Sequence, residues 1–294
     1  MNTYKDIPIV TEIPDDELKA FDKLIKKYRG EYIRSSKQIV DNVIESNIAQ
    51  VESSIERKNA SEAILFLRER CWAEFLKDEV CFNSLIMRDL RKIAKTPEVI
   101  LNDIVEKEVW HSDKEELLNT VKDVCGEYAG RIFPYIYKLS LSNTQSRRTR
   151  AGKTFEEIIY WLYQKLSYPY DSQSKVGRKL FDSVGLGKKV DSILPGIKNF
   201  TERRNKTIIG TMKTSLRERW QEVAEEIQRT NVPEIHLLTC DDNIPENKAL
   251  EIANHNITIV TFSWVADSES LKNIISFEEY FFTEIPNILR YWNE

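Results

Sequence analysis

Two short stretches in the C-terminal half decide the fold: Lys189-Val-Asp-Ser-Ile-Leu-Pro-Gly196 and Asn205-Lys-Thr-Ile-Ile-Gly-Thr-Met-Lys213. Each contains apolar, largely β-branched residues bounded by turn residues, which predicts a short β-strand. Further strands are predicted at residues 235–239 and 257–262, and helices at residues 153–166, 215–229, 246–254 and 277–291. Strands that alternate with helices predict an α/β fold class, with a mixed β-sheet flanked by helices.

The N-terminal half is predicted to be almost wholly helical. From residue 14 to about residue 140, apolar side chains recur at steps of three and four, as in Leu85, Ile86, Leu90 and Ile93. No motif there carries chemistry, so its Cys and Trp residues are interpreted as core. We expect a helical N-terminal region over residues 1–110 and an α/β core over residues 111–294.

Composition excludes several classes of protein. The chain has 294 residues, 41% of them hydrophobic and 31% charged, which is typical of a globular fold with a sizeable core. No apolar run approaches the roughly 18–20 residues of a membrane helix, and the N-terminus lacks the layout of a signal peptide. The four cysteines form no C-x-x-C pair and the three histidines no metal-ligand spacing. The sequence therefore predicts a cytoplasmic protein without structural disulfides or zinc.

Positive charge is concentrated in one block. Gln145 to Arg219 contains 17 Lys/Arg against 7 Asp/Glu, although the whole chain has a net charge of −4. A basic block within an acidic protein is typical of a surface that follows a phosphate backbone. A charged, solvated helix face is an equally good interpretation of charge alone.

An aspartate and a lysine occur on the two predicted strands. Asp191 and Lys213 are 22 residues apart, and a hairpin can bring them side by side at its open end. The carboxylate can bind Mg²⁺ and the ammonium can polarise an attacking water, as phosphodiester cleavage requires. The second acid of the usual nuclease pattern would stand two residues before the lysine, where this chain has Thr211. On this evidence alone, a plain surface pair is the alternative.

Helical periodicity selects two further acids. At about 100° per residue, the helix predicted at 215–229 buries a stripe that includes Trp220, Val223 and Ile227. Glu226 lies on the shoulder of this stripe, from which a side chain can reach the sheet edge, whereas Glu225 points to solvent. The same calculation places Glu156 on the shoulder of the buried stripe of the helix predicted at 153–166. We therefore expect Glu226, and with less support Glu156, to join the site.

The start of that helix carries side chains suited to base recognition. In Lys213-Thr-Ser-Leu-Arg-Glu-Arg-Trp220, Arg217 and Arg219 offer donors to guanine O6 and N7, and Glu218 offers an acceptor to the cytosine amino group. The alternative is a capping box formed by Ser215 and Glu218, with the two arginines in solvent.

At these residues the chain resembles a known family. Gln145-Ser-Arg-Arg-Thr-Arg-Ala-Gly-Lys-Thr-Phe-Glu156, Val190-Asp191 and Lys213-Thr-Ser-Leu-Arg-Glu-Arg219, with Glu226 behind them, are similar to the EcoRII-like, CCGG/CCNGG-reading type II restriction endonucleases of the PD-(D/E)XK superfamily. That branch moves the second acid to the following helix, which accounts for Thr211. Val190 stands where the superfamily motif has proline, a departure that the family tolerates.

The resemblance implies a role for each matching residue. Asp191 and Glu226 would hold Mg²⁺, Lys213 would assist the water, and Glu156 would support the metal site. Base recognition would come from the major groove through Arg217, Glu218 and Arg219, and from the minor groove through Gln145. The remaining arginines would hold phosphates or orient neighbouring groups: Arg147, Arg148 and Arg150.

The resemblance also implies partners and a product. The partners are double-stranded DNA, a second copy of the chain in at least a homodimer, and a cognate DNA methyltransferase in a restriction–modification pair. The cut would fall before the first C and leave a 5′ overhang. The residues favour a CCGG core, with or without specified outer pairs. CCNGG with flipped central bases is the alternative, and Trp72 or Trp110 could line a pocket, although both are interpreted as core.

Two other classes of function compete with the endonuclease. The chain could be a sequence-specific DNA-binding protein with an inactive nuclease fold, although the complete set Asp191, Lys213 and Glu226 argues against this. It could also be a helical interaction protein whose basic block balances acidic partners.

Overall fold

The computed structural model describes residues 4–186, 190–216, 219–230, 232–268 and 271–293; the side chains of Arg219, Glu226 and residues 228–230 lie outside this description. The chain forms two compact units that are interleaved in sequence. Unit 1 comprises Met1–Ser35 and Ala73–Thr149, and unit 2 comprises Ser36–Trp72 and Arg150–Glu294. Two long helices, α4 (Ala60–Asp89) and α7 (Phe133–Lys165), each contribute residues to both units. The functional boundary expected at residue 110 stays a prediction.

Unit 1 is helical, as predicted. Besides its parts of α4 and α7, it contains α1 (Asp15–Tyr32), the 3₁₀ turn η1 (Leu90–Lys92), α5 (Lys95–Lys107) and α6 (Lys114–Arg131). Buried polar groups join these helices. Glu17 accepts hydrogen bonds from the backbone N–H groups of Lys95 and Thr96 at the start of α5. Arg131 donates to the backbone carbonyls of Tyr4 and Ile7, which fixes the N-terminal segment.

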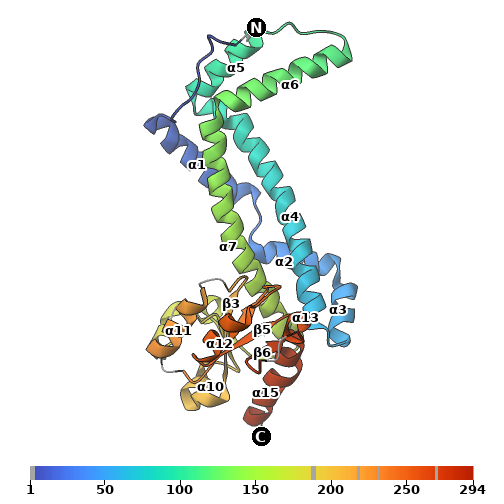
Figure 1. Ribbon diagram of the computed structural model, residues 1–294, viewed down its shortest axis with the longest axis vertical. Coiled ribbons are helices and arrows are strands. Elements are labelled where there is room, and N and C mark those ends of the chain that lie inside the picture. Colours follow the sequence, from blue (N-terminus) through green and yellow to red (C-terminus); the bar gives the residue numbers. More distant parts are fainter. Residues whose placement is uncertain (1–3, 187–189, 217–218, 231, 269–270, 294) are drawn as a thin grey trace. The chain divides into compact units, whose positions relative to one another are not determined.

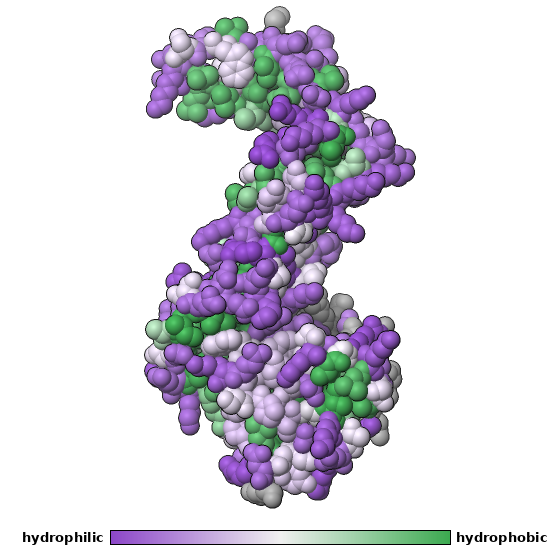
Figure 2. All heavy atoms as spheres, turned by 180° about the vertical axis from the view of Figure 1, so that it is seen from behind, coloured by the Kyte–Doolittle hydropathy of each residue, from purple (hydrophilic) through white to green (hydrophobic). Residues whose placement is uncertain are grey.

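One surface of unit 1 is apolar. Helix α6 buries only Thr120, Val124 and Arg131 among its residues. Figure 2 shows hydrophobic side chains exposed in the region of α5 and α6. The large exposed apolar residues of these two helices are Val99, Val105, Leu117, Leu118 and Val121. These side chains therefore contribute little to the core of unit 1.

Unit 2 is built on a six-stranded mixed sheet in the order β1-β2-β3-β4-β5-β6 (Figure 1). The strands are β1 (Asp171–Ser172), β2 (Ser192–Leu194), β3 (Ile208–Lys213), β4 (Ile235–Thr239), β5 (Ile257–Thr261) and β6 (Ile274–Ser276). The pairs β1–β2 and β2–β3 are antiparallel, and the pairs from β3 to β6 are parallel. The hairpin of β2 and β3 therefore opens at the same edge at which β4 and β5 end.

Helices cover this sheet. The helices that lie wholly in unit 2 are α2 (Ser36–Ser46), α3 (Ile48–Glu56), α8 (Gln173–Val176), α9 (Arg178–Ser183), α10 (Ile197–Glu202), η2 (Arg204–Lys206), α11 (Arg219–Thr230), α12 (Glu246–Ala253), α13 (Ser263–Ala266), α14 (Phe277–Glu279), the π-helical η3 (Tyr280–Glu284) and α15 (Ile285–Asn293). Trp220 of α11 contacts the ring of His255 after α12, so these helices lie side by side. Tyr163 of α7 contacts Ser192 of β2 and Tyr280.

The structure confirms the predicted α/β class and most of the predicted elements. The strands at 208–213, 235–239 and 257–261 and the helices after them lie where periodicity placed them. Two short edge strands, β1 and β6, were not predicted, and α11 begins at Arg219 rather than at residue 215. Asp191, expected on a strand, lies one residue before β2.

The prediction that the N-terminal Trp and Cys residues are core is wrong for several of them. Trp72 is 41% exposed and Trp110 is 49% exposed. Cys81 and Cys125 are also exposed, whereas Cys71 is buried. Helix α4 carries apolar residues around its whole circumference, so some of them must face solvent, and periodicity cannot select which. Trp110 follows the end of α5 and belongs to no helical stripe.

Within the described residues, no helix combines the length and the hydropathy needed to cross a membrane.

Candidate active site

The backbone around Asp191 is held by three hydrogen bonds. Its N–H donates to the carbonyl of Gly210 over 2.9 Å, which continues the β2–β3 pairing. Its carbonyl accepts from the hydroxyl of Tyr160 over 2.9 Å, and the carbonyl of Val190 accepts from Gln173 Nε2 over 2.8 Å. Asp191 therefore has a fixed backbone, although it lies just outside the strand.

Strand β3 must approach this region closely. A Cβ atom at Gly210 would lie 2.5 Å from Ser192 Oγ, so no side chain fits at that position. Glycine thus allows β2 and β3 to pair at Ser192, which lies opposite Gly210 in the register. This close pairing brings the ends of the two strands together.

The side chains of Asp191 and Lys213 meet, as the hairpin argument predicts. Lys213 Nζ lies 3.3 Å from Asp191 Oδ2 and also donates to the carbonyl of Met212 over 3.1 Å. The two side chains retain 15% and 16% exposure, so solvent and a ligand can reach both. The same Oδ2 atom accepts the backbone N–H of Met212 over 2.7 Å. A partly buried aspartate and lysine thus share one end of the hairpin.

Thr211 occupies the position at which the usual motif has its second acid. Its side chain is fully buried, and its hydroxyl donates to Asp191 Oδ2 over 3.3 Å. Thr211 therefore orients the Asp191 carboxylate and supplies no negative charge. A further carboxylate has to come from another element.

Glu156 of α7 is such a carboxylate. The pKa of Glu156 is raised to about 7, mainly by burial and also by the negative charge of Asp191, while the positive charge of Lys213 acts in the opposite direction. Both neighbours therefore lie close enough to act on the carboxyl group of Glu156. Two carboxylates that repel each other in a partly buried site are suited to bind a divalent cation.

The other predicted acid, Glu226, lies in α11, and its side chain is outside the described residues. Among those that are described, no group of three His, Cys, Asp or Glu could hold a metal ion. The stripe on which the prediction rested is buried, because Trp220, Val223 and Ile227 all face the interior, and Glu225 is exposed as expected. The position of Glu226 in the metal site stays a prediction.

The residues predicted to read bases fall in the segment between β3 and α11. Arg217 and Glu218 lie outside the described residues, and of Arg219 only the backbone, at the first position of α11, is described. The segment before them is fixed, because the backbone N–H of Leu216 donates to Asp241 Oδ2 over 2.6 Å. Leu216, three positions after Lys213, is the last described residue before Arg217.

The predicted DNA-contacting residues of α7 are divided between the units. Gln145, Arg147 and Arg148 are exposed in unit 1, whereas Arg150 is half-buried in unit 2. Arg147 forms an ion pair with Glu79, whose side chain is only 3% exposed. The roles expected of these arginines stay predictions.

Sequence reasoning missed three residues of this region: Tyr160, Gln173 and Asp241. Tyr160 stands one helical turn after Glu156, so the period that selected Glu156 could also have found it. Gln173 directly follows β1 and Asp241 lies just after β4, and neither residue belongs to a recognisable motif. Only the folded chain brings them to Val190 and Leu216.

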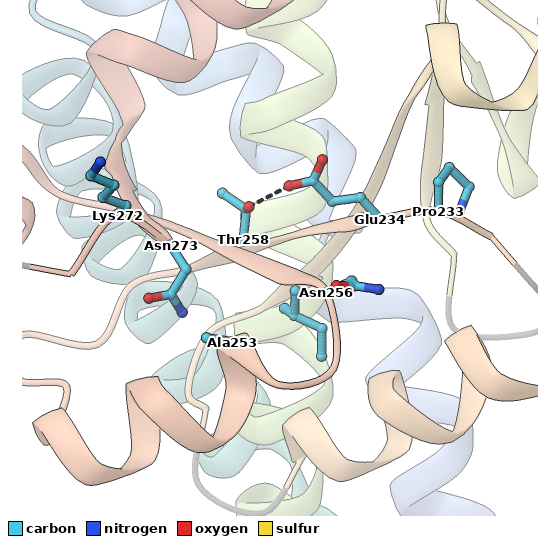
Figure 3. Close-up of a pocket in the computed structure, with 8 residues that line it drawn as sticks. Pro233, Glu234, Ala253, Asn256, Thr258, Lys272 and Asn273 are labelled. Atoms are coloured by element: carbon cyan, nitrogen blue, oxygen red, sulfur yellow. Dashed lines mark hydrogen bonds between the residues drawn. The ribbon is translucent and has the colours of Figure 1, made fainter.

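A cavity lies at the opposite edge of the sheet from Asp191 and Lys213, at the start of β4 and β5. It has a volume of about 450 Å³, and Glu234, Thr258 and Lys272 are among its lining residues. Figure 3 shows Thr258 pointing toward Glu234, to which its hydroxyl donates a hydrogen bond. The carboxylate of Glu234 therefore already has a hydrogen-bond donor. The described residues that line this cavity include no second carboxylate, unlike the edge at which Asp191 and Glu156 lie.

Comparison with known proteins gives consistent results for sequence and structure. The family described as EcoRII C terminal matches residues 120–281. The type II restriction enzyme SsoII of Shigella sonnei is 33% identical over 242 residues, which cover 82% of this chain and 73% of that enzyme.

Solved structures of two further enzymes are similar to this one. Metal-depleted Ecl18kI in complex with uncleaved DNA superimposes with a TM-score of 0.72 at 28% identity, over 94% of this chain and 86% of that chain. The complex of the restriction endonuclease PspGI with substrate DNA superimposes with a TM-score of 0.58 at 18% identity, over 88% and 94% of the respective chains. The second likeness shows the fold alone.

Proposed function

This chain belongs to the EcoRII C-terminal family of type II restriction enzymes, site-specific deoxyribonucleases, and from that premise we propose that it cuts a palindromic double-stranded DNA site with Mg²⁺ at the end of its β2–β3 hairpin. The observation that carries this proposal is the 3.3 Å contact between Asp191 and Lys213 beside the buried carboxyl group of Glu156. Such a group of charges suits a reaction in which negative charge develops on the oxygens of the scissile phosphate.

The residues at this edge fit a magnesium ion. Carboxylate oxygens are the ligands Mg²⁺ prefers, and a cation would relieve the repulsion between Asp191 and Glu156 that raises the pKa of Glu156. Asp191 and Glu226 would hold the ion, and Glu156 would support them. When bound, Mg²⁺ supplies charge stabilisation to the scissile phosphate and lowers the pKa of a bound water.

Lys213 has the role of orienting the nucleophile. Its Nζ donates to Asp191 Oδ2 and to the carbonyl of Met212, which holds the ammonium beside the metal ligand. From there it can donate to an attacking water or to the scissile phosphate. Thr211 and the N–H of Met212 fix the carboxylate that Lys213 contacts, so the two charged groups keep one geometry.

Recognition is assigned to the residues that match the family. We assign Arg217, Glu218 and Arg219 to adjacent G·C pairs in the major groove and Gln145 to the same pairs in the minor groove. Arg148 and Arg150 are assigned to phosphates, and Arg147 to orienting Glu79. The cut before the first C, with a 5′ overhang, follows from the same assignment.

A palindromic site requires matching symmetry in the protein. We therefore propose that two copies of the chain bind one site, with one catalytic edge for each strand. A host that contains such an enzyme needs a DNA methyltransferase that protects the same site. Both partners would act in the cytoplasm, where the DNA is.

One observation favours CCNGG over the CCGG core that the sequence favours. Helix α4 starts at the catalytic edge, because Ser61 accepts the backbone N–H of Ser263 just beyond β5. The charge of Arg68 acts on Cys240, directly after β4. Trp72 stands one turn further along α4 and is 41% exposed. An exposed indole beside this edge could stack on a base that is flipped out of the central pair.

Digestion of plasmid DNA tests the function and the site together. The full chain is incubated with DNA that contains CCGG and CCNGG sequences, with Mg²⁺ or with EDTA, and the fragment ends are sequenced. Metal-dependent ends before the first C of one sequence support the proposal and identify the site. Binding without cutting would indicate an inactive DNA-binding protein. If the chain neither binds nor cuts DNA, the result would indicate an interaction protein.

A further inference from the structure

The chain between the predicted catalytic lysine and the predicted recognition residues is short and is held at both ends by β4 and the residues directly after it. Lys213 pairs with Thr239 in the parallel register of β3 and β4. Three residues later, the backbone N–H of Leu216 donates to Asp241 Oδ2 over 2.6 Å. Thr239 is the last residue of β4 and Asp241 lies two residues beyond it, so one short piece of the chain holds both ends of this segment.

Asp241 itself is fixed by buried neighbours. Its N–H donates to Thr239 Oγ1 over 3.4 Å, and its carbonyl accepts from Thr261 Oγ1 over 3.4 Å. Both threonines are fully buried, one at the end of β4 and the other at the end of β5. The Asp241 carboxylate therefore projects from a backbone that two strands hold in place.

The contact between Asp241 and Leu216 is of a strong kind. A hydrogen bond from a backbone N–H to an ionised carboxylate is shorter and about twice as strong as one between neutral groups. Leu216 is only 2% exposed, so its amide has little access to water if the carboxylate is removed. The chain would then have to move at Leu216, immediately before Arg217.

We propose that Asp241 is a positioning residue for base recognition. It holds the chain at Leu216 and thereby sets the distance between Lys213 and the segment of Arg217, Glu218 and Arg219. This inference rests on the proposed function, because that function gives the three residues their role. Since bidentate contacts to bases need a defined geometry, a displaced segment loses discrimination between sites before it loses the ability to cut.

The test compares three variants of the full chain. Asp241→Ala removes the acceptor, Asp241→Asn keeps a neutral acceptor oxygen, and Asp242→Ala changes the adjacent, exposed aspartate as a matched control. Single-turnover cleavage is measured on the cognate duplex and on duplexes with one substituted base pair, together with DNA affinity without metal and the unfolding temperature.

We expect Asp241→Ala to reduce the ratio of cognate to substituted cleavage, measured at subsaturating enzyme so that the ratio includes binding, about 10-fold to 100-fold, the range of one good base contact. Its rate on cognate DNA at saturating enzyme should stay within about fivefold of the wild type, because Asp191 and Lys213 are unchanged. Asp241→Asn should reduce the ratio about threefold, since a neutral acceptor forms the weaker bond. Asp242→Ala should leave it unchanged.

The inference is overturned if Asp241→Ala keeps the wild-type ratio, or if Asp242→Ala lowers it equally. Should Asp241→Ala fail to fold, Asp241→Asn decides: an unchanged ratio overturns the inference and a moderate loss supports it. A wild-type chain that neither binds nor cuts DNA would overturn the proposed function as well. If the wild type discriminates between cognate and substituted DNA and the variants discriminate equally well, only the role of Asp241 is overturned.

Discussion

Buried acidic side chains serve different purposes in the two units. In unit 1 they bind structural donors: Glu17 accepts the N–H groups at the start of α5, Glu79 pairs with Arg147, and Asp89 accepts from Tyr28 and Arg88. In unit 2, Asp191 and Glu156 repel each other at one edge of the sheet. An acid with a complete set of partners stabilises a fold, whereas an acid whose pKa is raised by burial and by a neighbouring carboxylate, as for Glu156, indicates a site for a cation.

The largest effect is expected for Asp191→Asn. The substitution keeps the size of the side chain and removes its charge, so cleavage should fall by at least about 10³-fold, equivalent to about 4 kcal/mol. Metal-free DNA affinity should change less than about threefold. Single-turnover cleavage and a binding titration measure the two quantities. Cleavage within tenfold of the wild type would remove Asp191 from the site.

A structural acid should behave in the opposite way. Glu17→Ala leaves the N–H groups of Lys95 and Thr96 without their acceptor, which should lower the free energy of unfolding by about 3 kcal/mol. Cleavage per folded molecule at low temperature should not change. Urea unfolding measures the loss, and Asp16→Ala, an exposed neighbour, is the control. A loss of cleavage without a loss of stability would contradict the contrast between the units.

Neighbouring glutamates on α7 sharpen the comparison further. Glu156→Gln removes one of the two repelling carboxylates, so cleavage should fall about 10-fold to 100-fold, equivalent to roughly 1–3 kcal/mol. Glu157→Gln, one residue away, should change it less than about threefold. The two variants are compared over a titration of Mg²⁺, in which only Glu156→Gln should need more metal. Equal effects at both positions would exclude a specific role for Glu156.

A smaller effect concerns the dependence of stability on pH. His236 of β4 is buried, its Nδ1 has no hydrogen-bond partner among the described residues, and burial lowers its pKa below the usual value. The neutral ring is therefore favoured in the fold. The contribution of the neutral ring to the stability of the fold is complete above about pH 6.5, the pKa of histidine in the unfolded chain. It is lost as the pH falls through that value toward the lower pKa of His236 in the folded chain.

Unfolding at pH 5.0 and pH 7.5 tests this expectation. Wild-type stability should fall on acidification by about 1 kcal/mol per pH unit from this group, and His236→Gln should show a smaller decrease. His255→Gln, at a second, half-buried histidine, is the control. Identical slopes for the wild type and His236→Gln would show that the neutral ring does not control acid stability.

The central strands and the hairpin site could be predicted because their signals are local. Strands β3, β4 and β5 are apolar runs bounded by turns, and the position of Lys213 at the end of β3 follows from its place in the run. Two-residue β1 and three-residue β6 could not be predicted, since they are defined by pairing with β2 and β5 rather than by their own composition.

The site could be predicted only in part, because it depends on contacts between residues that are far apart in sequence. The helical period placed Glu156 on the correct side of α7, but its pKa depends on burial and on Asp191, which only the fold supplies. Tyr160 and Asp241 are ordinary polar residues whose partners lie 31 and 25 positions away. The orientation of Trp72 depends on which side of α4 the rest of unit 2 leaves open.

Iron-directed cleavage of the polypeptide tests the central claim most directly, because it locates the metal without reference to activity. Fe²⁺ replaces Mg²⁺ in the presence of DNA, ascorbate and peroxide generate hydroxyl radicals at the bound ion, and mass spectrometry maps the breaks in the chain. We predict breaks around Asp191 and around residues 211–213, lost in Asp191→Asn. Breaks at any other group of residues, unaffected by that substitution, would contradict the account.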